Sequence, residues 1–87
     1  MTATELRDHI VTALEDGKGQ DIQALDVSNL TPITDFMVLV TGTSNRHVKS
    51  LVDQAIEAAK GCGGRVRGVE GRESNEWVLV DLGDVIV

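Results

Sequence analysis

The single thiol of the chain is the first residue that could do chemistry. Cys62 would act as a nucleophile only with an imidazole beside it to take its proton. The two histidines, His9 and His47, fall in two separate predicted helices, and glycines flank the cysteine in the turn over residues 61–64. No GxSxG sequence offers a serine in its place. The pattern therefore favours a small, half-buried cysteine, and we predict no catalytic residues and no enzyme.

A glycine loop and a pair of aspartates are the next candidates, for a phosphate and a metal ion. Gly42-Thr43-Ser44 joins a predicted strand to a predicted helix, and free amides at a helix N-terminus attract anions. The chain has neither GxGxxG nor GxxxxGKS/T, and helix capping alone explains the two hydroxyl residues. Asp81 and Asp84 flank a glycine turn without a third ligand at suitable spacing. We predict no cofactor and no metal, and keep a nucleotidyltransferase-like enzyme or nucleotide-binding domain as the alternative function.

The charge of the chain is acidic and uneven. Fourteen Asp and Glu against eight Lys and Arg give a formal net charge of −6, and residues 69–87 hold five acids and one base. Three arginines in residues 65–72 are a local positive patch, and the chain has only two aromatic side chains for stacking bases. This composition argues against a nucleic-acid groove and favours a basic protein partner.

Two helices are predicted from the spacing of apolar residues. Thr2 stands three residues before Glu5, the spacing of a capping box, and apolar side chains then recur at helical intervals. This pattern predicts a helix over residues 3–16. A second apolar stripe predicts a helix that begins at the glycine loop and ends at Lys60.

The rest of the chain predicts a sheet. Apolar runs between turn residues predict strands at residues 22–27, 36–40, 65–69, 76–82 and from 85 onward. Residues 36–40 are apolar on both alternate faces, so we expect helices or a partner on each face of the sheet. Because 87 residues make one small core, residues 1–87 are predicted to form a single α/β domain, a mixed β-sheet flanked by helices.

The only tryptophan lies in the predicted strand over residues 76–82. Alternation directs Trp77, Leu79 and Asp81 to one face and three aliphatic side chains to the other. A tryptophan rimmed by acids has the composition of a hot spot for a basic partner. A tryptophan buried under a helix explains the same pattern and is slightly favoured on composition alone.

Five strings of the sequence fit one pattern. They are Leu25-Asp26-Val27-Ser28, Thr34-Asp35-Phe36, Thr41-Gly42-Thr43-Ser44-Asn45-Arg46-His47-Val48, Val69-Glu70-Gly71 and Trp77-Val78-Leu79-Val80-Asp81-Leu82-Gly83-Asp84-Val85. In this combination the chain resembles the ribosomal silencing factor family, RsfS or Iojap-like, from about residue 5 to the last residue. The resemblance implies a reduced nucleotidyltransferase-like architecture, although the C-terminal helix usual in the family has no counterpart in residues 1–87.

The resemblance also implies a function. A family member is expected to be a cytoplasmic translational repressor, a homodimer when free, and a negative regulator of ribosome biogenesis. It would bind large-subunit ribosomal protein L-fourteen and sterically block association of the ribosomal subunits, which silences translation under nutrient limitation. No membrane and no nucleic-acid groove is implied. By matching positions, the resemblance assigns partner binding to Glu70, Trp77, Leu79, Asp81, Leu82 and Asp84, and Leu82 departs from the aromatic residue found in many relatives.

Overall fold

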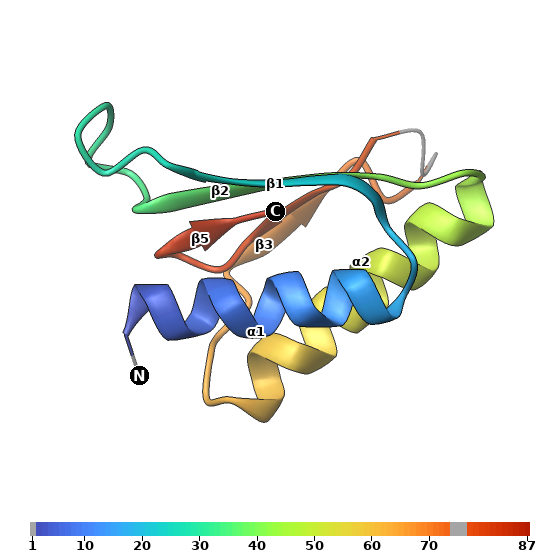
Figure 1. Cartoon of the computed structure of the whole chain (residues 1–87), viewed down its shortest axis with the longest axis horizontal. Coiled ribbons are helices and arrows are strands. Elements are labelled where there is room, and N and C mark those ends of the chain that lie inside the picture. Colours follow the sequence, from blue (N-terminus) through green and yellow to red (C-terminus); the bar gives the residue numbers. More distant parts are fainter. Residues whose placement is uncertain (1, 74–76) are drawn as a thin grey trace.

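The computed structural model describes residues 2–73 and 77–87. In that part of the chain two helices and five strands follow one another (Figure 1). They are α1 (Ala3–Asp16), β1 (Gln20–Asp26), β2 (Phe36–Thr41), α2 (Asn45–Gly61), β3 (Gly68–Glu70), β4 (Leu79–Asp81) and β5 (Val85–Ile86). The predicted α/β class with a mixed sheet is confirmed.

The strand order of the sheet is β1-β2-β5-β4-β3. Strands β2 and β5 are parallel, and the other three neighbouring pairs are antiparallel. The last of these strands in the sequence therefore lies between the two antiparallel pairs β1–β2 and β3–β4. It joins them into one sheet.

Both helices begin at side-chain caps that the sequence predicts. At α1 the hydroxyl of Thr2 accepts the N–H of Glu5 at 3.1 Å, and the Glu5 carboxylate accepts the N–H of Thr2, which completes a capping box. At α2 the hydroxyl of Ser44 accepts the N–H of His47 at 3.0 Å. The boundaries of α1 are those predicted, residues 3–16, and α2 differs from its predicted end by one residue.

The two helices lie on the same face of the sheet (Figure 1). The core between helices and sheet is made by one apolar stripe from each helix and by the inward side chains of β2, β4 and β5. Its buried members are Leu6, Ile10, Leu14, Phe36, Val38, Leu51, Val52, Ala55, Ala59, Val80, Leu82 and Val85. Within the described residues no helix covers the opposite face, so of the expected covering by helices or a partner only one face has helices, and a partner on the other face stays a prediction.

The strands differ from the predicted ones in length. Strand β1 begins two residues earlier than expected, and the ladder to β2 is irregular between Gln20 and Gln23, where Asp21 has a positive φ of 52°. Strands β3 and β4 are three residues each, shorter than the predicted ranges 65–69 and 76–82, and residues 74–76 lie outside the described part. Alternation of apolar residues therefore indicated the right segments of the chain but predicted longer strands than the structure has.

No helix in the described ranges is long and apolar enough to cross a membrane.

Candidate protein-binding surface

The face of the sheet opposite the helices is apolar and uncovered. One row of register partners crosses four strands of it, Leu25 on β1, Met37 on β2, Ile86 on β5 and Asp81 on β4. Leu25 is 41% exposed, and Leu39, two residues along β2 on the same face, is 46% exposed. We call this row with Leu39 and Leu79 the open sheet face. This face exposes aliphatic side chains, and the Asp81 carboxylate lies at one end of the row.

Trp77 lies two residues before Leu79 and its side chain is exposed. The residue is 60% exposed, so the interpretation that it is buried under a helix is wrong. Its ring lies against Gly71, where an added Cβ would stand 3.0 Å from ring atoms Cε3 and Cζ3. Gly71 also has a positive φ of 82°, which a side chain would disfavour. Because Gly71 has no side chain, the indole ring can pack against the backbone at this position.

Carboxylates lie at both ends of β4, with Glu70 near the tryptophan end and Asp81 and Asp84 at the other end. Glu70 is exposed and is the register partner of Leu79. Asp84 is exposed in the turn between β4 and β5. Asp81 is half-buried, and its Oδ1 accepts the N–H of Gly83 at 2.9 Å, so one of its oxygens holds the turn.

Leu82 has a different environment from the other predicted contact residues. It is 5% exposed and belongs to the core between sheet and helices. Alternation along the strand is the reason, since Leu82 follows Val80 on the helical face while Leu79 and Asp81 face the other way. A direct contact between its side chain and a partner is therefore not compatible with this fold.

The glycine loop before α2 is used for capping. The Thr43 N–H donates to Nδ1 of His47 at 2.9 Å, and Nε2 of the same ring lies 2.9 Å from the carbonyl oxygen of Gly17. A ring that accepts at Nδ1 carries its proton on Nε2, so it donates to Gly17 and ties the loop to the end of α1. The Thr43 amide and the Ser44 hydroxyl are thus engaged by the protein itself, which leaves the phosphate interpretation without support.

The candidate catalytic groups are far from forming a site. Cys62 is half-buried at the end of α2, with its Sγ 3.5 Å from the carbonyl oxygen of Ala59. His47 is held by the contacts just described, and His9 is exposed on α1. Among residues 2–73 and 77–87 no three His, Cys, Asp or Glu side chains gather to hold a metal ion. Arg72, one of the three arginines considered for nucleic acid, is paired with Asp53.

One carboxylate has a clearly shifted pKa, and it lies outside this surface. The hydroxyl and the N–H of Ser28 donate to Oδ1 of Asp26 at 2.6 and 3.0 Å and lower the pKa of that carboxyl below its ordinary value. Asp26 ends β1, so these bonds shape the start of the loop to β2.

The sequence prediction missed the aliphatic part of the surface, residues Leu25, Met37, Leu39 and Ile86. The signal was present in the apolar alternation of residues 36–40, which was interpreted as burial on both faces. Two helices in 87 residues can cover a five-stranded sheet on one face, as α1 and α2 do here (Figure 1). An apolar strand residue can therefore mark a surface as well as a core.

The fold and this surface define a small mixed α/β domain with helices on one face of the sheet and an exposed, largely apolar opposite face. Along residues 1–87 the chain matches the family model RsfS, described as ribosomal silencing factor during starvation. The chain belongs to this family of regulatory proteins, and membership supports a ribosome-associated role in silencing translation.

Individual relatives agree with this assignment. The Ribosomal silencing factor RsfS of Chromobacterium violaceum is 47% identical over 87 residues, which are 100% of this chain and 71% of the relative. A crystal structure of a Chromobacterium violaceum protein superposes with a TM-score of 0.97 at 47% identity, over 100% of this chain and 72% of that one. A second crystal structure, from Bacillus halodurans, gives a TM-score of 0.90 at 32% identity, over 97% and 78% of the two chains.

Proposed function

We propose that the chain binds ribosomal protein L-fourteen on the large subunit and sterically blocks the joining of the small subunit. The observation that carries this proposal is the exposed Trp77 next to an uncovered sheet face whose edges carry the exposed carboxylates of Glu70 and Asp84. A partner embedded in a particle rich in RNA is typically basic, and the chain has a net charge of −6. Such a protein would act in the cytoplasm, where subunits meet during nutrient limitation, and would also restrain ribosome biogenesis.

The proposed contact residues are Glu70, Trp77, Leu79, Asp81 and Asp84. The carboxylates raise the rate of encounter with a basic surface and orient the two proteins. The indole is then desolvated against the partner, a contact that costs about 2 kcal/mol or more when truncated. Leu82 is absent from this surface because it is part of the core.

Blocking requires only occupancy. The principal extents of the described chain are 32 × 23 × 23 Å. A rigid body of this size, held on the face where the subunits meet, prevents their close approach for as long as it stays bound. The residence time of the chain on the large subunit therefore sets the degree of silencing.

Sedimentation of purified ribosomal subunits tests the proposal. Added in excess, the chain is expected to bind large subunits and to reduce the fraction of joined ribosomes. Trp77→Ala is expected to lose most of this effect. Leu30→Ala is the control, because Leu30 is also a large apolar side chain, 82% exposed, but lies away from this surface on the loop between β1 and β2. Unchanged subunit joining at saturating wild-type protein would refute the proposal.

The free chain is also proposed to be a homodimer, through the open sheet face. Exposed Leu25 and Leu39 on an uncovered sheet are the supporting observation, because a second copy would remove this apolar area from water. Leu39→Glu should then convert the dimer to monomers in analytical ultracentrifugation. Wild-type protein that is monomeric at all concentrations would refute this assembly without affecting the ribosome proposal.

A further inference from the structure

A basic segment joins α2 to β3 in this acidic chain. Residues 58–69 contain Lys60, Arg65 and Arg67 and no Asp or Glu, whereas the whole chain has a formal net charge of −6. All three cationic residues are exposed. In Figure 1 the connection runs on the helix side of the sheet, from the end of α2 up to the edge strand β3. We call residues 60–68 the basic segment.

The cations of the basic segment have no carboxylate partner within the described residues. None of the three takes part in an ion pair there. Lys49 on α2 is different, because it lines a hollow on the helices together with Asp16, Asp53 and Glu57. The positive charge of the basic segment is therefore less neutralised by its surroundings than that of Lys49.

The side chain of Arg67 is held in place by the turn between β4 and β5. A Cβ added at Gly83 would stand 3.1 Å from Nε and 3.4 Å from Cζ of Arg67, so the missing side chain at Gly83 leaves room for the guanidinium. The N–H of Arg67 donates to the carbonyl oxygen of Asp81 at 2.7 Å. An arginine that is already positioned loses less conformational freedom when it binds a ligand.

Glycines leave the backbone between these cations uncovered. A Cβ added at Gly63 or at Gly68 would meet no atom within 4 Å. Gly63 has a positive φ of 85°, which accounts for the glycine at that turn. Gly68 has neither a positive φ nor a close neighbour that requires glycine. Such a residue permits a ligand to approach the backbone closely beside Arg67.

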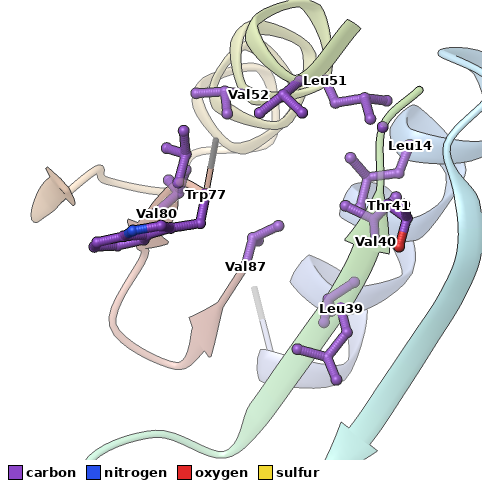
Figure 2. A pocket seen from close by; sticks show the side chains of 13 residues that line it. Leu14, Leu39, Val40, Thr41, Leu51, Val52, Trp77, Val80 and Val87 are labelled. Carbon is purple, nitrogen blue, oxygen red and sulfur yellow. The ribbon is translucent and has the colours of Figure 1, made fainter. Parts of the chain in front are cut away.

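The apolar cavity between β2, β4 and α2 has a different chemistry. Figure 2 shows its lining, with Leu51, Val52 and Val80 among the labelled side chains. None of its described lining residues is charged. An anion would lose its hydration there without gaining a cationic partner, so the basic segment is the better anion-binding surface.

We propose that the basic segment binds the sugar-phosphate backbone of an RNA strand. Exposed Lys and Arg side chains neutralise phosphates, and contacts of this kind read no base sequence. They need neither a groove nor aromatic side chains for stacking, which are the features that the composition of the chain argues against. RNA carries a phosphate at every nucleotide, so several charges can meet three closely spaced cations. The proposal goes beyond the ribosome contact, whose proposed residues are on β3, β4 and the turn to β5.

Titration of the ¹⁵N-labelled 87-residue chain with an RNA hairpin of about sixteen nucleotides tests the proposal. In about 20 mM KCl the amide signals of residues 63–68 should shift as RNA is added. Contact with about three phosphates should make the affinity fall at least tenfold when KCl is raised to about 200 mM. Absence of shifts, shifts confined to the open sheet face, or an affinity independent of salt would each overturn the proposal.

Substitutions at Arg65 identify the contact. Arg65→Glu should weaken RNA binding at least tenfold, whereas Arg65→Lys should change it less than threefold because a lysine also binds phosphate as a point charge. Lys49→Glu is the matched control, since it makes a charge reversal at another exposed cation and should cost less than threefold. An equal loss in Arg65→Glu and Lys49→Glu would overturn the proposal, because position would then not matter.

An acidic protein is the other class of partner for a basic surface, and polyglutamate of about sixteen residues represents it. This peptide should bind at least tenfold more weakly than the hairpin. Equal binding of the peptide would assign the basic segment to an acidic protein and overturn the RNA proposal. Because free RNA is the probe, the result is separate from the sedimentation assay: RNA binding can fail while the chain still blocks subunit joining, and the reverse.

Discussion

The two faces of the sheet have similar composition and opposite environments. Val38 and Leu39 are neighbours on β2, and the first is buried under the helices while the second is 46% exposed. Apolar side chains on the helical face stabilise the fold, whereas those on the other face leave area for a partner. Along β2, alternate apolar residues therefore have different uses: those facing the helices stabilise the fold, and those on the other face are available for binding. Substitutions on the first face should reduce stability, and substitutions on the second should reduce binding.

The largest effect is expected on the helical face. Ile10 on α1 is fully buried, and Ile10→Ala should lower the free energy of unfolding by about 2 to 5 kcal/mol because it leaves a cavity. Leu39→Ala on the open face is the matched variant and should cost less than about 1 kcal/mol. Urea titration followed by circular dichroism measures both. Equal losses of unfolding free energy in the two variants would contradict the proposed difference between the two faces.

Gly71 affects both the stability of the fold, through its backbone conformation, and the position of the exposed Trp77 ring. Gly71→Ala puts a side chain at a positive φ and against the indole and the carbonyl of Trp77. We expect a stability loss of about 1 to 3 kcal/mol from the backbone strain, together with displacement of the ring. Tryptophan fluorescence should therefore change in the folded protein, and affinity for large subunits should fall. Gly61→Ala, where an added Cβ meets nothing within 4 Å, is the control.

Charge reversal on the rim should alter kinetics with little change in stability. Asp84→Lys removes an exposed carboxylate while keeping the backbone carbonyl that accepts the N–H groups of Asp35 and Phe36. The association rate with large subunits should drop several-fold at low salt, and the difference should shrink as salt screens the charges. Glu57→Lys is the control, because it makes the same change of charge at an exposed residue of α2. A similar loss in both variants would show that only net charge matters.

The smallest effect concerns Asp26, outside both faces. Its pKa is lowered by hydrogen bonds from Ser28, so the carboxylate stabilises the folded chain above the ordinary aspartate pKa of 3.8, and this contribution disappears as pH falls through the lowered value. Wild type should therefore be more stable than Asp26→Asn at pH 6, and the gap should narrow at pH 3. Urea midpoints at the two pH values measure it. A gap that widens in acid would contradict the assigned cause.

Local features of the fold were predictable, and long-range ones were not. The capping box at Thr2 and the apolar spacing after it fix α1 to the residue, because both act within a few positions of the chain. Nothing local indicates that β5 pairs with β2, since that pairing joins residues about fifty positions apart, such as Phe36 and Val85.

The candidate site was also predictable only where it depends on local alternation along a strand. Alternation placed Trp77, Leu79 and Asp81 on the side of the strand opposite Val80, as the structure does for the two residues in β4. The exposure of Trp77 depends on which face the helices cover, which is a property of the assembled fold. The same dependence hid the exposure of Leu25 and Leu39. Leu82 is buried on the face that alternation predicts for it, and only the resemblance had assigned it to partner binding.

The position of β5 has a consequence for the chain during its own synthesis. The pairs β1–β2 and β3–β4 can each form as soon as their residues emerge, but neither pair touches the other through backbone bonds until residues 85 and 86 arrive. A nascent chain thus carries two unjoined sheet fragments, with their apolar edges available to neighbours, until almost all of these 87 residues have been translated.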